Sequence, residues 1–496
     1  MGSDNPDQLD FAGDYNLSGI VVINHAGEGT NIQHMVLEMN IYEGIDKSSV
    51  TGTLVVTDAT NLIGNLPLQG TERLIFKLST PGTDHSEDII DASELTGHPF
   101  YIYRVSNRNQ LSQGVLSYII HFGSREFVRN LRVKVSKSYE GSIDTIVKQI
   151  LSDKEGLDTR KNVYFEATKN SDKVVIPNLS PFGAINLLKD RALPNNGNGA
   201  GYFFYETTKG FYFRSWGDMC TQNHYHPREA IQKFHYSPQN ISDDKLNDNP
   251  NPEKKDVQDK VLHDLQSVES YKVVNQFHDT AAQTALGTYG HRVITHNLYD
   301  KSFSKTDFHY HNEFDEFVHT DFTFNESSAG KYAVVNTPVD FDNKSVSDYA
   351  ESRVSLMPTS QFVYGEETGT YGTNVSDDGK FEGYRIATNN AINAGTTIEL
   401  TVKGQTYIQP GHIILFDLRP VEEKGVTNDN KPYDRQYSGR YIVRSIRHRV
   451  SKTDYKMVLV IVKDSVREPF PLADKRFTGE SFREGPEFIH TTRIWR

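Results

Sequence analysis

The chain has 496 residues and a formal net charge of −12. At about 150 residues per domain, this length predicts roughly three or four domains. The acidic balance argues against a protein that reads nucleic acid, because such proteins normally carry a basic patch. A single cysteine, Cys220, excludes an internal disulfide and fits folding in a reducing cytoplasm.

No stretch of the sequence predicts a secretory signal or a membrane span. The start, MGSDNPDQLDFAGDYN, has neither a basic nor an apolar region, so we expect no signal peptide. The unbroken apolar run Met457–Val462 is far shorter than the roughly 20 residues that cross a bilayer.

Residues 1–125 predict one strand after another. Apolar residues recur at every second position in 35–41 and again in 74–78, and turn-forming clusters such as STPGTDHS separate the segments. A period of two with regular turns is typical of a β-sandwich or barrel. We therefore expect a first β-barrel domain over 1–125.

Residues 126–220 predict a small mixed α/β domain. Ser142 can cap a helix, and Ser180 followed by Pro181 marks the start of a second one. Residues 201–215, GYFFYETTKGFYFRS, predict an aromatic hairpin. The apolar residues of the first helix recur at helical spacing and are Ile143, Ile146, Val147, Ile150 and Leu151.

The remaining sequence divides into three parts. Strand patterns in 221–300 and 386–466 predict a second β domain, a sandwich or a barrel, whereas 301–385 shows no strong period and is expected to be an inserted lobe of unknown role. Residues 467–496 are expected to form an extended C-terminal arm. The predicted fold class is mainly β with α+β insertions: two β-barrel domains plus a small mixed α/β domain.

The strand in Met457–Val462 is apolar on both faces. Met457, Leu459 and Ile461 share one face, while the three valines between and after them share the other. A strand of this kind has to be covered twice, by its own domain and by something else. We therefore expect Met457, Leu459 and Ile461 to contribute to a subunit or partner interface.

Histidines offer the one candidate metal site. His309 and His311 lie two residues apart, so on a strand they share a face, and His319 is near them in sequence. The alternative is that these are surface or interface histidines, which a chain with 18 histidines brings together by chance. This alternative is favoured, and no metal or other cofactor is expected.

Other catalytic patterns are missing or weak. The glycine-rich PNNGNGAG lacks the Lys-Ser/Thr of a phosphate-binding loop. Glu313 with Asp315 or Glu316 could serve glycoside hydrolysis only if two carboxyl groups faced each other across a cleft. The sequence therefore predicts a protein that is not an enzyme.

The order of several segments resembles the central baseplate hub protein of T-even-like contractile-tailed phages, in particular the versions of marine cyanophages. The segments that carry this resemblance are YNLSGIVVI, SIDTIVKQIL, VIPNLSPFGAINLLKDRA, GYFFYETTKGFYFRS, SYKVVNQFHDT, GTYGHRVITHNLYD, TTIELTVKGQTYIQPGHIILFDL and SGRYIVRSIRHRVSKTDYKMVLVIVKDSV.

The resemblance implies two barrels similar to the tail-tube fold in one chain. Three chains would form a homotrimeric, pseudo-sixfold ring that joins the sixfold tail tube to the threefold central spike. The implied partners are the spike, the tail tube protein, the tape-measure protein and the baseplate wedge proteins. DNA would pass through the lumen without specific binding, and the protein would be located in the virion after assembly in the host cytoplasm.

Two departures and two alternatives accompany this resemblance. Residues 300–385 match nothing in the family pattern, and the arm, with Phe482, Phe488 and Trp495, either clasps the spike or a baseplate neighbour or is a disordered tail. A peripheral receptor-binding tail component is the first alternative function, and a tail-associated hydrolase is the second.

Overall fold

The protein is described here by a computed structural model. It describes residues 11–65, 68–81, 89–95, 97–169, 172–195, 201–221, 232–236, 261–276, 279–297, 301–321, 332–339, 342–359, 365–366, 369–370, 378–418 and 433–467. The architecture is mainly β with several helices, which confirms the predicted fold class. No helix within these ranges is long and apolar enough to cross a membrane.

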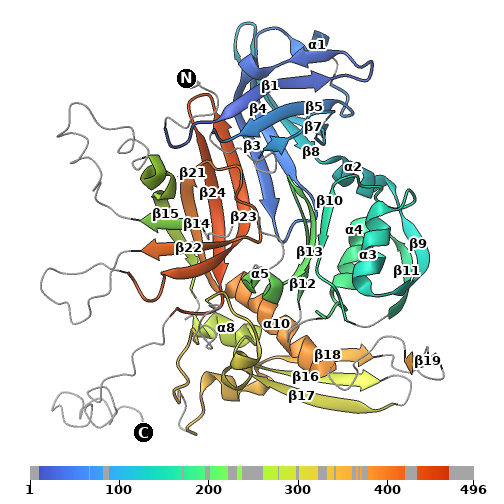
Figure 1. Cartoon of the computed structure of the whole chain (residues 1–496), viewed down its shortest axis with the longest axis vertical. Helices are drawn as coiled ribbons and strands as arrows, with labels where there is room; N and C mark the ends of the chain where they lie inside the picture. The colour runs from blue at the N-terminus through green and yellow to red at the C-terminus, as the bar shows by residue number, and fades with distance from the viewer. Residues whose placement is uncertain are drawn as a thin grey trace, which may run out of the picture.

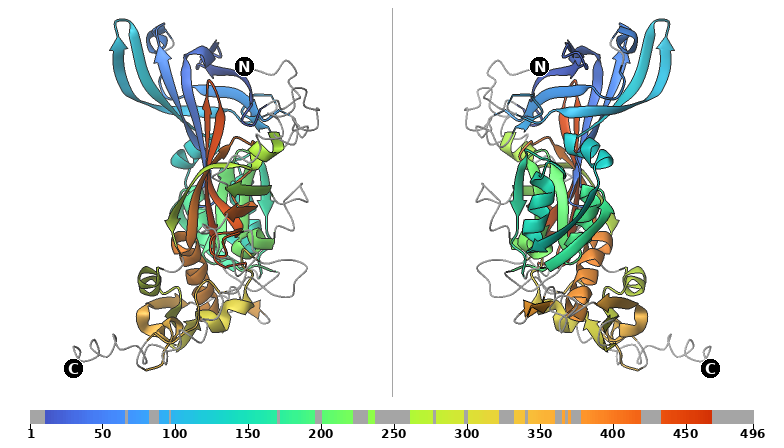
Figure 2. Two further views of the ribbon diagram at one scale, coloured as in Figure 1. Left: turned by 90° about the vertical axis from the view of Figure 1, so that its left-hand side faces the viewer. Right: turned by 90° about the vertical axis from the view of Figure 1, so that its right-hand side faces the viewer.

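The N-terminal strands make one part of a large sheet. Its elements are β1 (Asn16–Ile23), β2 (Gly29–Asn31), β3 (Val36–Gly44), β4 (Thr51–Asp58), β5 (Arg73–Ser79), β6 (Ile90–Asp91), β7 (Phe100–Ser112) and β8 (Val115–Gly123), with η1 (Gln33–Met35) and α1 (Leu62–Asn65) between them. They pair in the order β3-β4-β8-β7-β5-β1-β2. The far ends of β7 and β8 project as a long hairpin (Figure 2).

The second set of strands comes from distant parts of the chain. It comprises β14 (Gln232–Tyr236), β15 (Val268–Asn275), β21 (Thr396–Lys403), β22 (Ile413–Leu418), β23 (Gly439–Ser451) and β24 (Tyr455–Lys463). The ladder order is β15-β21-β24-β23, and β22 pairs with both β23 and β14. An isolated bridge from His235 to Ser267 brings β14 beside β15.

A ladder joins the two strand sets to each other. The second half of β23 pairs antiparallel with β3, from Ser445 opposite Gly44 to Ser451 opposite Glu38, and this ladder joins all these strands into one 14-stranded sheet. Figure 1 shows β21, β24, β23 and β3 side by side. Within the described strands the ladders alone do not close either set into a ring, and both sets contribute side chains to one shared hydrophobic core.

The mixed domain packs helices on short sheets. It contains α2 (Arg125–Arg132), β9 (Val135–Gly141), α3 (Ile143–Ser152), β10 (Asn162–Phe165), β11 (Asp172–Leu179), α4 (Pro181–Lys189), β12 (Tyr202–Thr207), β13 (Gly210–Ser215) and α5 (Trp216–Thr221). The two predicted helices and the aromatic hairpin are all present. The Ser180 hydroxyl accepts from Gly183 N, as its capping role requires.

The region without a sequence period folds as a lobe. Its elements are α8 (Thr280–Leu286), β16 (Gly290–Asn297), β17 (Phe303–His309), α9 (Tyr310–Glu313), η3 (Phe314–Glu316), η4 (Val346–Asp348), η5 (Ala350–Ser352), β18 (Val354–Thr359), β19 (Gly365–Glu366), β20 (Gly369–Thr370) and α10 (Asp378–Ala394). The expected boundary at residue 301 falls between β16 and β17, which pair with each other, so this lobe begins earlier in the chain.

Candidate functional site

One face of the large sheet is left open. Core residues on β3, β4, β23 and β24 alternate with residues of the opposite face, which the pairing registers align from strand to strand. The members of this open face are Glu399, Thr401 and Lys403 of β21, Lys456, Val458 and Val460 of β24, Ser445, Arg447 and Arg449 of β23, Glu38, Asn40 and Tyr42 of β3, and Thr51, Thr53 and Val55 of β4. Nearly all are half-buried, whereas their neighbours on the core face are buried.

The charges on the open face are largely paired. Arg447 Nε donates to Asn40 Oδ1 at 2.8 Å, and Arg449 Nε donates to Glu38 Oε2 at 2.8 Å. Lys403 and Lys456 both contact Glu269, each at 2.8 Å. Burial opposes ionisation of Glu38, but hydrogen bonds from Asn40 and Arg449 hold its pKa below the ordinary value. Each of the four cations thus contacts a carboxylate, but two arginines share Glu38 and two lysines share Glu269, so these clusters keep a positive charge.

A buried polar trio lies behind the junction of β3 and β23. His448 Nδ1 lies 2.7 Å from Tyr455 Oη, and His448 Nε2 lies 3.6 Å from Glu43 Oε1. A carboxylate, an imidazole and a hydroxyl in this order resemble a nucleophilic triad. All three side chains are at most 1% exposed, so a substrate cannot reach them, and we assign them a structural role in joining the two parts of the sheet.

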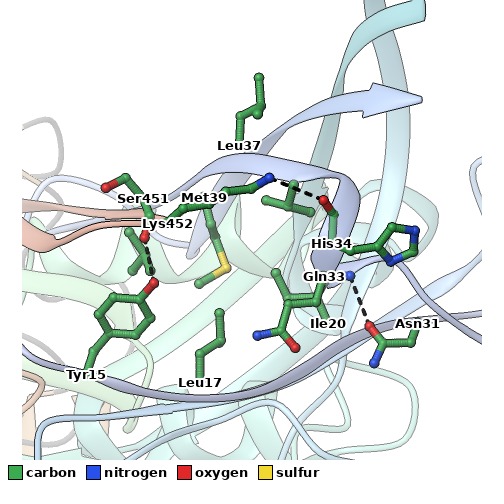
Figure 3. A pocket seen from close by; sticks show the side chains of 12 residues that line it. Tyr15, Leu17, Ile20, Asn31, Gln33, His34, Leu37, Met39, Ser451 and Lys452 are labelled. Atoms are coloured by element: carbon green, nitrogen blue, oxygen red, sulfur yellow. Dashed lines mark hydrogen bonds between the residues drawn. The ribbon is translucent and has the colours of Figure 1, made fainter. Parts of the chain in front are cut away.

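A groove of about 560 Å³ opens at one edge of the sheet, between β1, the start of β3 and the turn from β23 to β24 (Figure 3). Tyr15 Oη donates to Ser451 O at 2.6 Å, and Lys452 Nζ donates to His34 O at 3.3 Å. The apolar lining includes Leu17 and Met39, and the lining contains no carboxylate. It is suited to receive an apolar side chain and lacks the paired groups of general acid–base catalysis.

A buried ion pair attaches the mixed domain to the sheet. Glu206 of β12 accepts hydrogen bonds from Val50 N at 2.8 Å and from the Ser124 hydroxyl at 2.7 Å, and it pairs with Lys161. Lys161 also lies 3.3 Å from Glu126. Burial opposes the charge on Lys161, yet the two carboxylates raise its pKa above the ordinary value. Because these groups come from both domains, the pair fixes how the domains are oriented.

A second buried network attaches the lobe to the end of β24. Asp464 accepts hydrogen bonds from Trp216 Nε1 at 3.1 Å, from His319 Nδ1 at 2.9 Å and from Thr320 N at 2.9 Å. His319 Nε2 lies 2.7 Å from the carbonyl oxygen of Phe314, so both ring nitrogens donate and the ring is protonated. Burial opposes this charge, but the Asp464 carboxylate raises the pKa of His319.

The three candidate histidines do not converge. His309 contacts Asp348 at 3.2 Å, and His311 contacts Ser347 Oγ and Val334 O, both at 2.9 Å. His319 belongs to the Asp464 network. Across the part of the chain that the structure describes, no group of three His, Cys, Asp or Glu side chains is arranged to hold a metal ion.

The expected interface residues Met457, Leu459 and Ile461 require a correction. All three are 0% exposed, because their side chains point into the hydrophobic core that the chain's own strands enclose. The side chains on the opposite face of the strand lie in two different environments. Val462 packs with Ile392 of α10 in a separate cluster, while Val458 and Val460 belong to the open face.

The other expected interface residues and the groove have different outcomes. Phe482, Phe488 and Trp495 lie outside the described residues.

The open face had a sequence signal in the alternation of Thr397, Glu399, Thr401 and Lys403, but the groove had none. Its lining comes from residues more than 400 positions apart, such as Tyr15 and Ser451, which only the folded chain brings together.

No family model matches the chain, and no curated protein matches its sequence. Among solved structures, it aligns with a tail protein from Neisseria meningitidis (TM-score 0.46, 9% identity, 91% of this chain and 97% of the other). It also aligns with the 43 kDa tail protein of prophage MuSo2 from Shewanella oneidensis (TM-score 0.46, 9% identity, 91% of this chain and 100% of the other). A third solved structure that aligns with it is the E. coli c3393 protein of the type VI secretion system (TM-score 0.38, 10% identity, 93% of this chain and 79% of the other). These neighbours are tail and secretion-machine components.

Proposed function

We propose that this chain is the structural hub of a phage tail baseplate, in which three copies close into a ring around a channel. The observation that carries the proposal is the ladder between β23 and β3. It merges two strand sets into one sheet, so that a single chain supplies two adjacent segments of a wall. Three chains would supply six such segments, which would match a sixfold tube on one rim and a threefold spike on the other.

The open face is the surface that would line the channel. The cations of this sheet face already contact carboxylates, so DNA would meet few free cations there. The formal net charge of −12 of the whole chain adds a long-range repulsion of DNA. DNA could then pass without being held, and the tape-measure protein could occupy the same channel before ejection.

The remaining parts of the proposal concern partners and activity. The spike, the tail tube protein and the wedge proteins are the proposed neighbours, and the virion is the proposed location. No catalytic activity is proposed for this chain, since the Glu43, His448 and Tyr455 side chains are closed off from substrate.

The experiment is a mass measurement followed by site-directed labelling. Native mass spectrometry and light scattering of the purified chain are expected to give a trimer, and electron microscopy is expected to show a hollow ring. A Thr53→Cys variant on the open face should then react with a small maleimide but not with a large polyethylene-glycol maleimide. Leu131→Cys on α2, where the side chain is 67% exposed, is the matched control that should react with both. A monomer that labels equally at both positions would contradict the proposal.

A further inference from the structure

Among the described residues, the sheet of the lobe is covered on one side only. β16 lies between β17 and β18, and α10 packs against one face of this sheet, where Phe308 meets Tyr384 with ring centroids 6.3 Å apart. On the opposite face the pairing registers align three rows across the strands. These rows are Phe303–His296–Pro358, Lys305–Ile294–Leu356 and Asp307–Arg292–Val354.

Five of the nine residues of the uncovered face are apolar, and ion pairs lie at one end of it. Phe303 is 77% exposed, Leu356 is 71% exposed and Val354 is 53% exposed; Leu356 lies directly opposite Ile294, and the other two lie in the rows on either side. Arg292 contacts Asp307 and Glu351, each at 2.6 Å. Single exposed apolar residues are ordinary on a protein surface, but a contiguous group with a polar rim is typical of a surface that is covered by another segment.

The described part of the chain ends in this lobe, on the side of the sheet that α10 covers. Val466 is 4% exposed and packs in the core of this same lobe, with Tyr289, Phe308 and Phe314. The sequence that follows lies outside the described residues and ends in FIHTTRIWR, from Phe488 to Arg496. Between Val466 and Phe488 an extended chain reaches up to roughly 70 Å, which exceeds the dimensions of a lobe of this size.

We propose that the terminal segment Phe488–Trp495 packs on the uncovered face of the lobe sheet of its own chain. Its apolar side chains, which are Phe488, Ile489, Ile494 and Trp495, match a face formed by Phe303, Ile294, Leu356 and Val354. A tethered segment has an effective concentration in the millimolar range, so it covers the patch ahead of a free partner. This inference concerns a single chain and holds whether or not the chain forms a ring.

Tryptophan fluorescence gives the first test, because the chain has only two tryptophans. Trp216 is 4% exposed and serves as a constant background. The difference between the emission of the unaltered chain and that of Trp495→Phe is the emission of Trp495. We expect it to have the short wavelength of a buried indole. Leu356→Asp should move this emission to longer wavelength, whereas Leu131→Asp, at a position of similar exposure on α2, should not. A Trp495 signal that is already solvent-exposed in the unaltered chain would overturn the proposal.

Cross-linking gives the second test and leaves the apolar patch intact. Arg496→Cys is combined with Lys305→Cys on the lobe sheet or with Lys137→Cys on β9, whose side chains are 51% and 54% exposed. Cys220 is buried and does not compete for reagent. A short bismaleimide should link positions 496 and 305 within one chain about tenfold more than 496 and 137. Equal yields, or links between different chains, would overturn the proposal.

Discussion

Arg447 on β23 donates a hydrogen bond from Nε to Oδ1 of Asn40 on β3, at 2.8 Å, although the two residues are more than 400 positions apart in sequence. The contact lies on the ladder that makes two strand sets one sheet. Behind it, on the core face, Glu43 and His448 face each other at 3.6 Å. The junction is thus defined by polar groups on both faces of the sheet, and it sets the geometry of the open face.

The first prediction concerns the contact between the mixed domain and the sheet. Glu206→Gln leaves Lys161 buried beside Glu126 alone and weakens the bonds to Val50 N and the Ser124 hydroxyl. We expect the free energy of unfolding to fall by about 3 kcal/mol, because one partner of a buried ion pair is removed. Denaturant unfolding measures this. The control Glu140→Gln, at a side chain 51% exposed, should change it by less than about 1 kcal/mol.

The second prediction is a pH dependence that originates at His319. The folded-state pKa of His319 is raised, so its stabilising contribution is complete below the unfolded value of about 6.5 and is lost as the pH rises through the folded value. The unfolding free energy should therefore fall as the pH rises above about 6.5. His319→Gln should remove this slope. If the unfolding free energy of the variant depends on pH as steeply as that of the unaltered chain, the pH dependence arises from a group other than His319.

The third prediction concerns Asp321, which is 7% exposed and accepts a hydrogen bond from Arg440 N at 2.9 Å. Burial raises its pKa to about 6, so the charged form costs stability above that pH. We expect Asp321→Asn to stabilise the fold at pH 7 by about 1–3 kcal/mol and to have little effect near pH 4. Thermal unfolding at both pH values tests this. The exposed Asp264→Asn should show no such difference.

The fourth prediction concerns the packing of β4 against β8. A Cβ on Gly52 would lie 2.5 Å from the Asn40 carbonyl oxygen and would also overlap the ring of Phe122. Gly52→Ala should therefore destabilise the protein by about 1–3 kcal/mol through overpacking. Gly217→Ala is the matched control, because its Cβ would meet its nearest neighbour at 3.8 Å. Equal melting temperatures for the two variants would contradict this account.

Local patterns in the sequence predict the individual elements well. The alternation in 35–41 and 74–78 corresponds to β3 and β5, and the helical spacing after Ser142 and Ser180 corresponds to α3 and α4. These signals are local, since a period of two or 3.6 residues needs only a few consecutive side chains. The lobe lacked such a signal because apolar residues of β17 and β18, such as Phe303, Val354 and Leu356, lie on the exposed face of its sheet.

What the sequence by itself determined is the set of strands and helices, the mainly β class and the need to cover both faces of Met457–Val462. Only the tertiary structure decided what covers them. Met457, Leu459 and Ile461 turned out to face the chain's own core, and Val458 and Val460 an open face. The physical reason is that the alternation of side chains fixes which face of a strand is apolar, whereas it does not say which distant strand pairs with it, and β23 pairs with β3 from the other end of the chain.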